Sequence, residues 1–150
     1  MSLLLSRLPG DDVGANTRKA HTGGCLCGNI RFEAKAPALK PHTCSCRMCQ
    51  RHTGGLTVAW VEFAREDVMW TGPGGTPALW RSSDFSSRAF CSSCGSSLGA
   101  VDDDPVIALL VGVFDAPQRK DLIPAYHSYR TPRPKWWCVE IKDAGPGRNP

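Results

Sequence analysis

Cys91-Ser92-Ser93-Cys94-Gly95 is a C-x-x-C-G motif, in which a tight turn directs two sulfur atoms toward one point. The glycine after the second cysteine lets backbone N–H groups approach those sulfurs. Two sulfurs make only half of a structural zinc site, because such a site takes four ligands. The motif therefore predicts a zinc site that is completed by residues from elsewhere in the chain.

The natural second pair is Cys25 and Cys27, a C-x-C motif that follows two glycines much earlier in the sequence. This pairing would tie the first strand of the domain to its middle. The alternative, in which Cys44 and Cys46 complete the C-x-x-C-G site, leaves a remainder of cysteines that is hard to use. The sequence thus favours a closed site of four thiolates, the pattern of structural zinc.

A second cluster is formed by Cys44, Cys46 and Cys49, three cysteines within six residues that can fold around one ion by themselves. Three thiolates leave one position open, as is typical of a metal that binds a substrate or water. His42 and His52 flank the cluster, and either one could close it as a fourth ligand. We expect an open site, and we take its three cysteines as the candidate catalytic residues.

The eighth cysteine, Cys138, lies between Trp137 and Val139, and we expect it to pack in the core of a last strand. Eight is an even number, so a set of disulfides is the alternative to metal binding. A redox role for the C-x-x-C-G motif would need a βαβ context that this stretch lacks. No apolar run is long enough for a signal peptide or a membrane span, so we expect a cytoplasmic protein with reduced thiols.

The composition is that of one globular domain of 150 residues, 41% hydrophobic and 21% charged. Fifteen glycines and twelve prolines divide the sequence into short pieces, which favours a mainly β fold of short strands with little helix. The net charge of +4 permits an anionic ligand. It is too diffuse for a nucleic-acid footprint, so we expect no nucleic-acid partner and no membrane.

The strand-like segments follow one another through the chain. Residues 30–34 and 137–141 alternate apolar with polar side chains, and residues 56–63 are rich in β-branched and aromatic side chains. Residues 106–111 form an apolar run, and three shorter candidates are separated by Gly, Pro and Ser. The predicted strands cover residues 30–34, 56–63, 68–70, 78–81, 85–90, 106–111 and 137–141. Helical turns are expected at residues 47–52 and 116–121. We expect an N-terminal arm over residues 1–20, a zinc-binding domain over 21–143 and a tail over 144–150.

The three cysteine motifs also carry a family resemblance. They read Gly23-Gly24-Cys25-Leu26-Cys27-Gly28, Cys44-Ser45-Cys46-Arg47-Met48-Cys49 and Phe90-Cys91-Ser92-Ser93-Cys94-Gly95, with Thr53-Gly54-Gly55, Val113-Phe114-Asp115, Pro124, His127, Pro134, Trp136 and Trp137 beside them. In this order they resemble the glutathione-dependent formaldehyde-activating enzyme family, also called the centromere-protein-V-like family. The resemblance implies the Mss4-like fold, made of short antiparallel sheets organised around zinc.

The resemblance also implies two zinc ions per chain. Its structural zinc maps to Cys25, Cys27, Cys91 and Cys94, and its catalytic-type zinc maps to Cys44, Cys46 and Cys49. The sequence departs from the family at Ser45, where a histidine is common, and at Arg47, where a small residue is common. Neither change removes a ligand, but both lie beside the expected reaction centre and bear on which substrate is used.

The implied activity is that of a carbon–sulfur lyase, which joins a thiol such as glutathione to an aldehyde such as formaldehyde. Arg47, Arg51 and Lys135 are candidate partners for the carboxylates of glutathione, although each could equally be a solvated surface charge. The alternative function is a non-catalytic zinc module for protein interaction or chaperoning, which would need only the four-cysteine site. Sensing or storage of metal or formaldehyde is a third interpretation.

Overall fold

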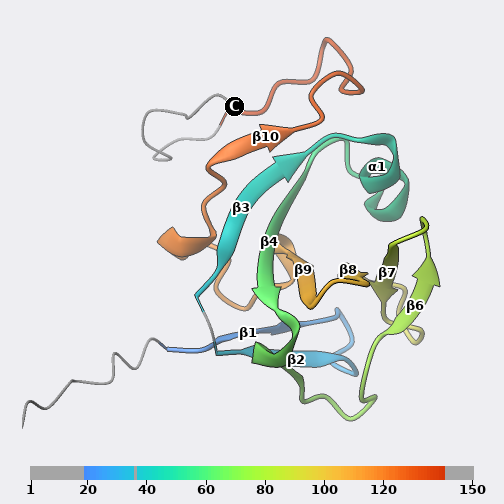
Figure 1. The fold of residues 1–150 in the computed structure, drawn as a ribbon, viewed down its shortest axis with the longest axis vertical. Helices are drawn as coiled ribbons and strands as arrows, with labels where there is room; N and C mark the ends of the chain where they lie inside the picture. Colours follow the sequence, from blue (N-terminus) through green and yellow to red (C-terminus); the bar gives the residue numbers. More distant parts are fainter. Residues whose placement is uncertain (1–18, 36, 141–150) are drawn as a thin grey trace, which may run out of the picture.

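The computed structural model describes residues 19–35 and 37–140, and within them the chain forms two β-sheets. The larger sheet has seven strands. In spatial order these are β10 (Tyr126–Ser128), β3 (Leu39–Cys44), β4 (Val58–Ala64), β9 (Val106–Leu110), β8 (Ser97–Asp102), β7 (Ser86–Phe90) and β6 (Ala78–Arg81). All neighbours pair antiparallel except β10 and β3, which run parallel along one side of the molecule (Figure 1).

The smaller sheet contains β1 (His21–Gly24), β2 (Arg31–Ala34) and β5 (Val68–Trp70), all antiparallel. Its first strand, β1, also contacts the segment between β9 and β10, through an isolated bridge between Gly23 and Phe114. The helical elements are short: α1 (Arg47–Thr53) and the single 3₁₀ turns η1 (Arg65–Asp67), η2 (Val111–Val113) and η3 (Lys120–Leu122). The fold is mainly β, as the glycine and proline content predicts. Within the described residues no helix is long and apolar enough to cross a membrane.

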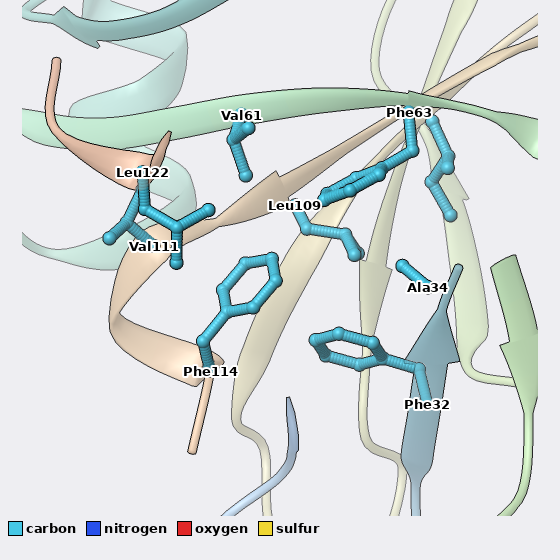
Figure 2. Close-up of a cluster of buried hydrophobic side chains, with 9 residues drawn as sticks. Phe32, Ala34, Val61, Phe63, Leu109, Val111, Phe114 and Leu122 are labelled. Atoms are coloured by element: carbon cyan, nitrogen blue, oxygen red, sulfur yellow. The ribbon is translucent and has the colours of Figure 1, made fainter. Parts of the chain in front are cut away.

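Around its centre, the larger sheet is buried on both faces. Because successive side chains of a strand point to opposite faces, each central strand contributes side chains to both buried layers. Val61, Phe63 and Leu109 point toward Phe32 of the smaller sheet and Phe114, and form the main core (Figure 2). Their neighbours in sequence point the other way. Trp60 and Leu110 pack with Ala100 and with two cysteines of the second cluster, Cys44 and Cys49. One face of the sheet therefore carries the core between the sheets, and the other supports the second cluster and α1.

Most segments with a clear β pattern form strands where they are expected. β5 and β6 have the predicted bounds, β2, β4, β7 and β9 lie within a residue or two of theirs, and α1 covers the predicted turn at residues 47–52. The turn expected at residues 116–121 forms only as η3, at residues 120–122. The expected arm lies almost wholly outside the described residues, and so does the expected tail.

The prediction of a last strand at residues 137–141 is wrong over its described part, residues 137–140, which are irregular chain. Cys138 is exposed there, so the prediction that it packs in the core is also wrong. Pro134 starts a turn in which its carbonyl accepts a hydrogen bond from the backbone of Trp137 at 3.0 Å. This turn lies on the surface, where Trp136 is 75% exposed. Among the described residues, no strand pairs with the alternating segment that follows the turn.

Candidate metal centres

The four cysteines of the first group come from two hairpin-like turns at the ends of β1 and β7. The sulfurs of Cys25, Cys27, Cys91 and Cys94 all lie within 4.8 Å of one another. The Cys25 and Cys27 sulfurs are 3.5 Å apart, and those of Cys27 and Cys91 are 3.8 Å apart. A tetrahedral ion with metal–sulfur distances of about 2.3 Å needs sulfurs about 3.8 Å apart. The group therefore fits a four-coordinate ion.

Backbone hydrogen bonds hold both turns in place. The Gly95 N–H donates to the Cys91 carbonyl at 2.9 Å, and the Ile30 N–H donates to the Cys25 sulfur at 3.2 Å. Gly28 and Gly95 take positive φ angles of 78° and 75°, which glycine adopts without steric cost. The two turns are joined by the Leu26 N–H, which donates to the hydroxyl of Ser96 at 3.0 Å. The motif glycines are thus required by the turns that aim the sulfurs.

The second group lies where β3 ends and α1 begins. The sulfurs of Cys44, Cys46 and Cys49 lie within 4.8 Å of one another, and those of Cys44 and Cys49 are 3.6 Å apart. Cys46 is the N-cap of α1, and its sulfur accepts a hydrogen bond from the Cys49 N–H at 3.3 Å. Cys44 and Cys49 are buried, whereas Cys46 is half-buried. The strand and the helix cap thus bring three sulfurs together around one point.

Crowded sulfurs shift each other's pKa values. The hydrogen bond from the Cys49 thiol lowers the pKa of Cys44 to about 6, and the same contact raises the pKa of Cys49. In the first group, the hydroxyl of Ser96 lowers the pKa of Cys94 to about 5. Thiolates this close repel one another, so they cannot all be ionised unless a cation balances them. The donor chemistry of both groups therefore fits a thiophilic divalent ion.

The sequence left open that either of two flanking histidines closes the site as a fourth ligand, and the structure places neither with the three sulfurs. His42 stacks on Tyr126 with 5.1 Å between ring centres, and its Nδ1 lies 2.8 Å from the Lys40 carbonyl oxygen. His52 stacks on Trp60, with 6.5 Å between ring centres. Among the described residues, the group of possible ligands at this place consists of the three cysteines alone.

The three cationic candidates lie in different surroundings. Arg47 is exposed on α1 and donates to the side-chain oxygen of Gln50. Arg51 is also exposed on α1, and it lines a pocket between this helix and the larger sheet. Lys135 is exposed in the C-terminal segment. Only Arg51 of the three thus lines this pocket.

The surroundings of the second group include Ser45, His127 and Trp137, which the sequence patterns marked, and Thr57 and Arg88, which they did not. Ser45, buried between two of the cysteines, bonds through its hydroxyl to Thr57 at 2.7 Å and to His127 at 2.9 Å. The Trp137 indole donates to Thr57 at 3.1 Å. Arg88, on β7, stacks over Trp60 at 5.7 Å. No local motif marks Thr57, which lies just before β4, or Arg88, which sheet pairing brings to the site from β7.

Two sheets with two sulfur groups define the class: a mainly β protein that can hold metal ions at two cysteine centres. The family model described as glutathione-dependent formaldehyde-activating enzyme matches residues 20–131, about three quarters of the chain. The chain therefore belongs to the glutathione-dependent formaldehyde-activating enzyme family, as its motifs predict. The matched residues contain both sulfur groups.

A crystal structure of a Rhodobacter sphaeroides protein has a similar fold, with a TM-score of 0.53. The two sequences are 19% identical, and the match covers 71% of this chain and 99% of the other. At this identity the likeness concerns the fold alone. It supports the two-sheet architecture that carries the sulfur groups.

Proposed function

We propose that this protein is a zinc-dependent enzyme of the carbon–sulfur lyase type, which joins a glutathione-like thiol to an aldehyde such as formaldehyde. The observation that carries this proposal is the three-sulfur group of Cys44, Cys46 and Cys49. A strand end and a helix cap bring its three sulfurs together around one point, as two turns do in the four-sulfur group. The three-sulfur group nevertheless supplies one ligand fewer than a closed site takes. In a formaldehyde-activating family, the position left open is where a substrate thiol would bind.

The proposed reaction is an addition that needs no oxidant or reductant. The thiol sulfur forms a bond to the aldehyde carbon, the carbon–oxygen π bond breaks, and the thiol proton ends on that oxygen. The reverse reaction releases thiol and aldehyde. Because both reactants are small and mobile in water, holding them in contact is a large part of what an enzyme can contribute.

In this proposal the seven cysteines have unequal roles. Cys25, Cys27, Cys91 and Cys94 hold a structural zinc that fastens the β1 turn to the β7 turn. The other three cysteines hold a second zinc beside the N-terminus of α1. A zinc ion with an open position would lower the pKa of a thiol that binds there, so that thiolate forms at neutral pH. The half-buried Cys46 is the least enclosed of these three residues, which is consistent with access from that side.

Arg47, Arg51 and Lys135 are proposed partners for the carboxylates of the thiol substrate. An arginine can bind a carboxylate with two parallel hydrogen bonds, whereas a lysine acts as a point charge. We further propose that the protein works in the reducing cytoplasm. All eight cysteines are free thiols, which supports this assignment over a disulfide framework.

The rival function is a non-catalytic interaction module of the same fold. Such a module needs only the four-sulfur group, and the exposed Leu26 in the turn between Cys25 and Cys27 could serve as a contact residue. The second sulfur group argues for the enzyme instead. A buried Cys44–Cys49 pair with its own helix cap has no evident use in a module that the first group already stabilises.

The test uses the full chain loaded with zinc under anaerobic conditions. Glutathione and formaldehyde are mixed with the protein, and the exchange between free and hydroxymethylated thiol is followed by NMR. We expect faster exchange than in buffer, and we expect Cys46→Ser to abolish the increase while the protein stays folded. A wild-type protein that binds no thiol and leaves the exchange rate unchanged would favour the interaction module.

A further inference from the structure

A pocket of about 700 Å³ opens between α1 and the edge of the larger sheet. Met48, Arg51 and His52 of α1 form one wall, and Trp80 of β6 with Arg88 and Phe90 of β7 form the other. Figure 1 shows α1 on the same side of the molecule as β6 and β7. Two arginines and, among the described residues, no acidic side chain line the pocket, so its charge suits an anion.

Arg88 is held inside this pocket without an anionic partner. Its guanidinium lies over the Trp60 ring at 5.7 Å, and its Nη2 meets the Met48 sulfur at 2.7 Å. Thioether sulfur is only a weak acceptor. The Arg88 Nε is buried and has no hydrogen-bond partner among the described residues, which also offer Arg88 no ion pair. A guanidinium fixed this way can still bind a carboxylate.

Two other buried nitrogens close to Arg88 also have no hydrogen-bond partner in the part of the chain that the structure describes. They are Nε1 of Trp60 and Nε2 of His52, whose ring stacks on the Trp60 ring. An indole N–H and an arginine Nε–H can only donate, so this part of the protein has more donors than acceptors. Buried donors of this kind are normally satisfied by protein, water or ligand. A ligand that brings oxygen acceptors would correct the imbalance.

The pocket also lies next to both sulfur groups. Trp60, beneath Arg88, packs on the other side against Cys44 and Cys49. Gly95 and Ser97, just after the C-x-x-C motif, also line the pocket. A molecule whose thiol reached the three-sulfur group could therefore extend its remaining part along α1 into this pocket. Its apolar atoms would meet Trp80 and Phe90.

We propose that this pocket binds the carboxylate-bearing end of the thiol substrate, with Arg88 as the main partner and Arg51 at the exposed rim. The inference rests on the proposed function, because it assigns a place to the same substrate. It adds Arg88 to the cations that the sequence suggested. Since a half-buried arginine without an anionic partner forms stronger contacts with a carboxylate than a solvated one does, Arg88 should contribute more affinity than the exposed Arg51.

The test separates the two ends of the ligand by calorimetry on the zinc-loaded full chain. S-methylglutathione carries both carboxylates but no free thiol, whereas cysteamine carries a thiol but no carboxylate. We expect Arg88→Gln to weaken S-methylglutathione at least about tenfold and Arg51→Gln to weaken it less. Cysteamine binding should be unchanged in both variants. The charge-matched control is Lys35→Gln, on the smaller sheet, and it should bind both probes like the wild type.

The outcomes distinguish this inference from the proposed function. An unchanged affinity for S-methylglutathione in folded Arg88→Gln, or no binding to the wild type, overturns the pocket assignment even if aldehyde exchange is catalysed. Binding that depends on Arg88 in a protein without exchange activity supports the pocket and contradicts the enzyme. If Arg88→Gln fails to fold, Arg51→Gln decides, because this side chain is exposed. An unchanged affinity in that variant then also overturns the inference.

Discussion

The Nε2 atom of His127 lies 2.9 Å from the hydroxyl oxygen of Ser45, the buried residue inside the three-sulfur group. The same hydroxyl is 2.7 Å from that of Thr57, which accepts a hydrogen bond from the Trp137 indole. Because an indole N–H can only donate, the network is complete when Thr57 donates to Ser45 and Ser45 to a neutral His127. Burial lowers the pKa of His127, which keeps the ring neutral. The C-terminal segment is thereby fastened to the second sulfur group.

Removing the hydroxyl of Ser45 should destabilise the protein. Ser45→Ala leaves the His127 nitrogen and the Thr57 hydroxyl, both on half-buried residues, without their common, fully buried partner. Unsatisfied buried groups cost about 1–3 kcal/mol. We expect a loss of unfolding free energy in this range, measured by urea denaturation of the zinc-loaded protein.

The matched control is Ser87→Ala on β7, whose hydroxyl has no hydrogen bond within the described part of the chain. It should change the unfolding free energy by less than about 0.5 kcal/mol. Equal stabilities for the two variants would mean that the network around Ser45 contributes nothing measurable.

The two sulfur groups should respond differently to loss of one cysteine. Cys94→Ser removes a ligand from the group that joins two parts of the chain, and structural zinc contributes on the order of 10 kcal/mol to folding. We expect this variant to unfold or aggregate. Cys46→Ser should stay folded and contain one zinc per chain instead of two, as measured by elemental analysis alongside circular dichroism.

Cys138→Ser provides the control for this experiment, because Cys138 is exposed and lies in neither group. It should retain two zinc ions and wild-type stability. A wild-type protein that holds a single zinc after anaerobic preparation would contradict the two-site proposal.

The cysteine groups could be predicted from sequence because each is built by local spacing. C-x-C and C-x-x-C turns place two sulfurs on one point whatever the rest of the chain does. The pairing of the C-x-x-C-G turn with Cys25 and Cys27 was predicted because pairing it with Cys44 and Cys46 leaves cysteines over. The structure brings Cys25 and Cys27 to this turn, as predicted. Arg88, which reaches the site from β7 through the pairing of distant strands, and Thr57, which precedes β4, have no such local signature.

Four strands were not predicted from the sequence, namely β1, β3, β8 and β10. Two of them, β3 and β10, lack a regular alternation for physical reasons. β3 contains Pro41 and a register shift after Leu39, and Lys40 has a positive φ of 44°. A bulge and a proline interrupt the two-residue period on which the prediction depends. β10 has only three residues and exists because β3 lies beside it. At residues 137–140 the error was the opposite one, a predicted strand that does not form. Apolar and polar side chains alternate there, but no strand of the described residues pairs with this segment.

Close packing between the sheets makes a further prediction at Gly23. A Cβ atom there would lie 2.3 Å from the Val113 carbonyl oxygen and 2.5 Å from the Phe32 ring. Gly23→Ala must therefore push β1 away from the chain after β9. Overpacking of this kind costs about 1–3 kcal/mol, which thermal or urea unfolding would detect.

Gly112 offers the comparison, since a Cβ at that position would meet nothing within 4 Å. Gly112→Ala should leave stability within about 0.5 kcal/mol of the wild type. If both variants lost the same stability, the close approach at Gly23 would not be the cause.

The buried ring of His21 makes the stability depend on pH. Its Nε2 lies 3.0 Å from a carboxylate oxygen of Asp121, and the ring contacts Phe63 and Phe114 edge-on. Loss of hydration lowers the pKa of His21 below its ordinary value of 6.5, although Asp121 opposes the shift and Arg119 adds to it. Between the folded and unfolded pKa values the unfolded chain binds more protons, so stability rises with pH there. The contribution is complete above 6.5 and is lost as the pH falls from 6.5 toward the folded pKa.

The measurement compares wild type and His21→Gln by urea unfolding at about pH 8 and about pH 5.5, which bracket the ordinary histidine pKa. Acid also displaces zinc from thiolates, but this loss is common to both proteins and cancels in the comparison. The lowered pKa of Asp121 acts at more acidic pH, because that carboxylate ordinarily titrates at 3.8. We therefore expect the wild type to lose more stability than His21→Gln between the two pH values. Equal losses would show that His21 can be protonated in the folded protein without a penalty, and that the salt bridge to Asp121 compensates fully for its burial.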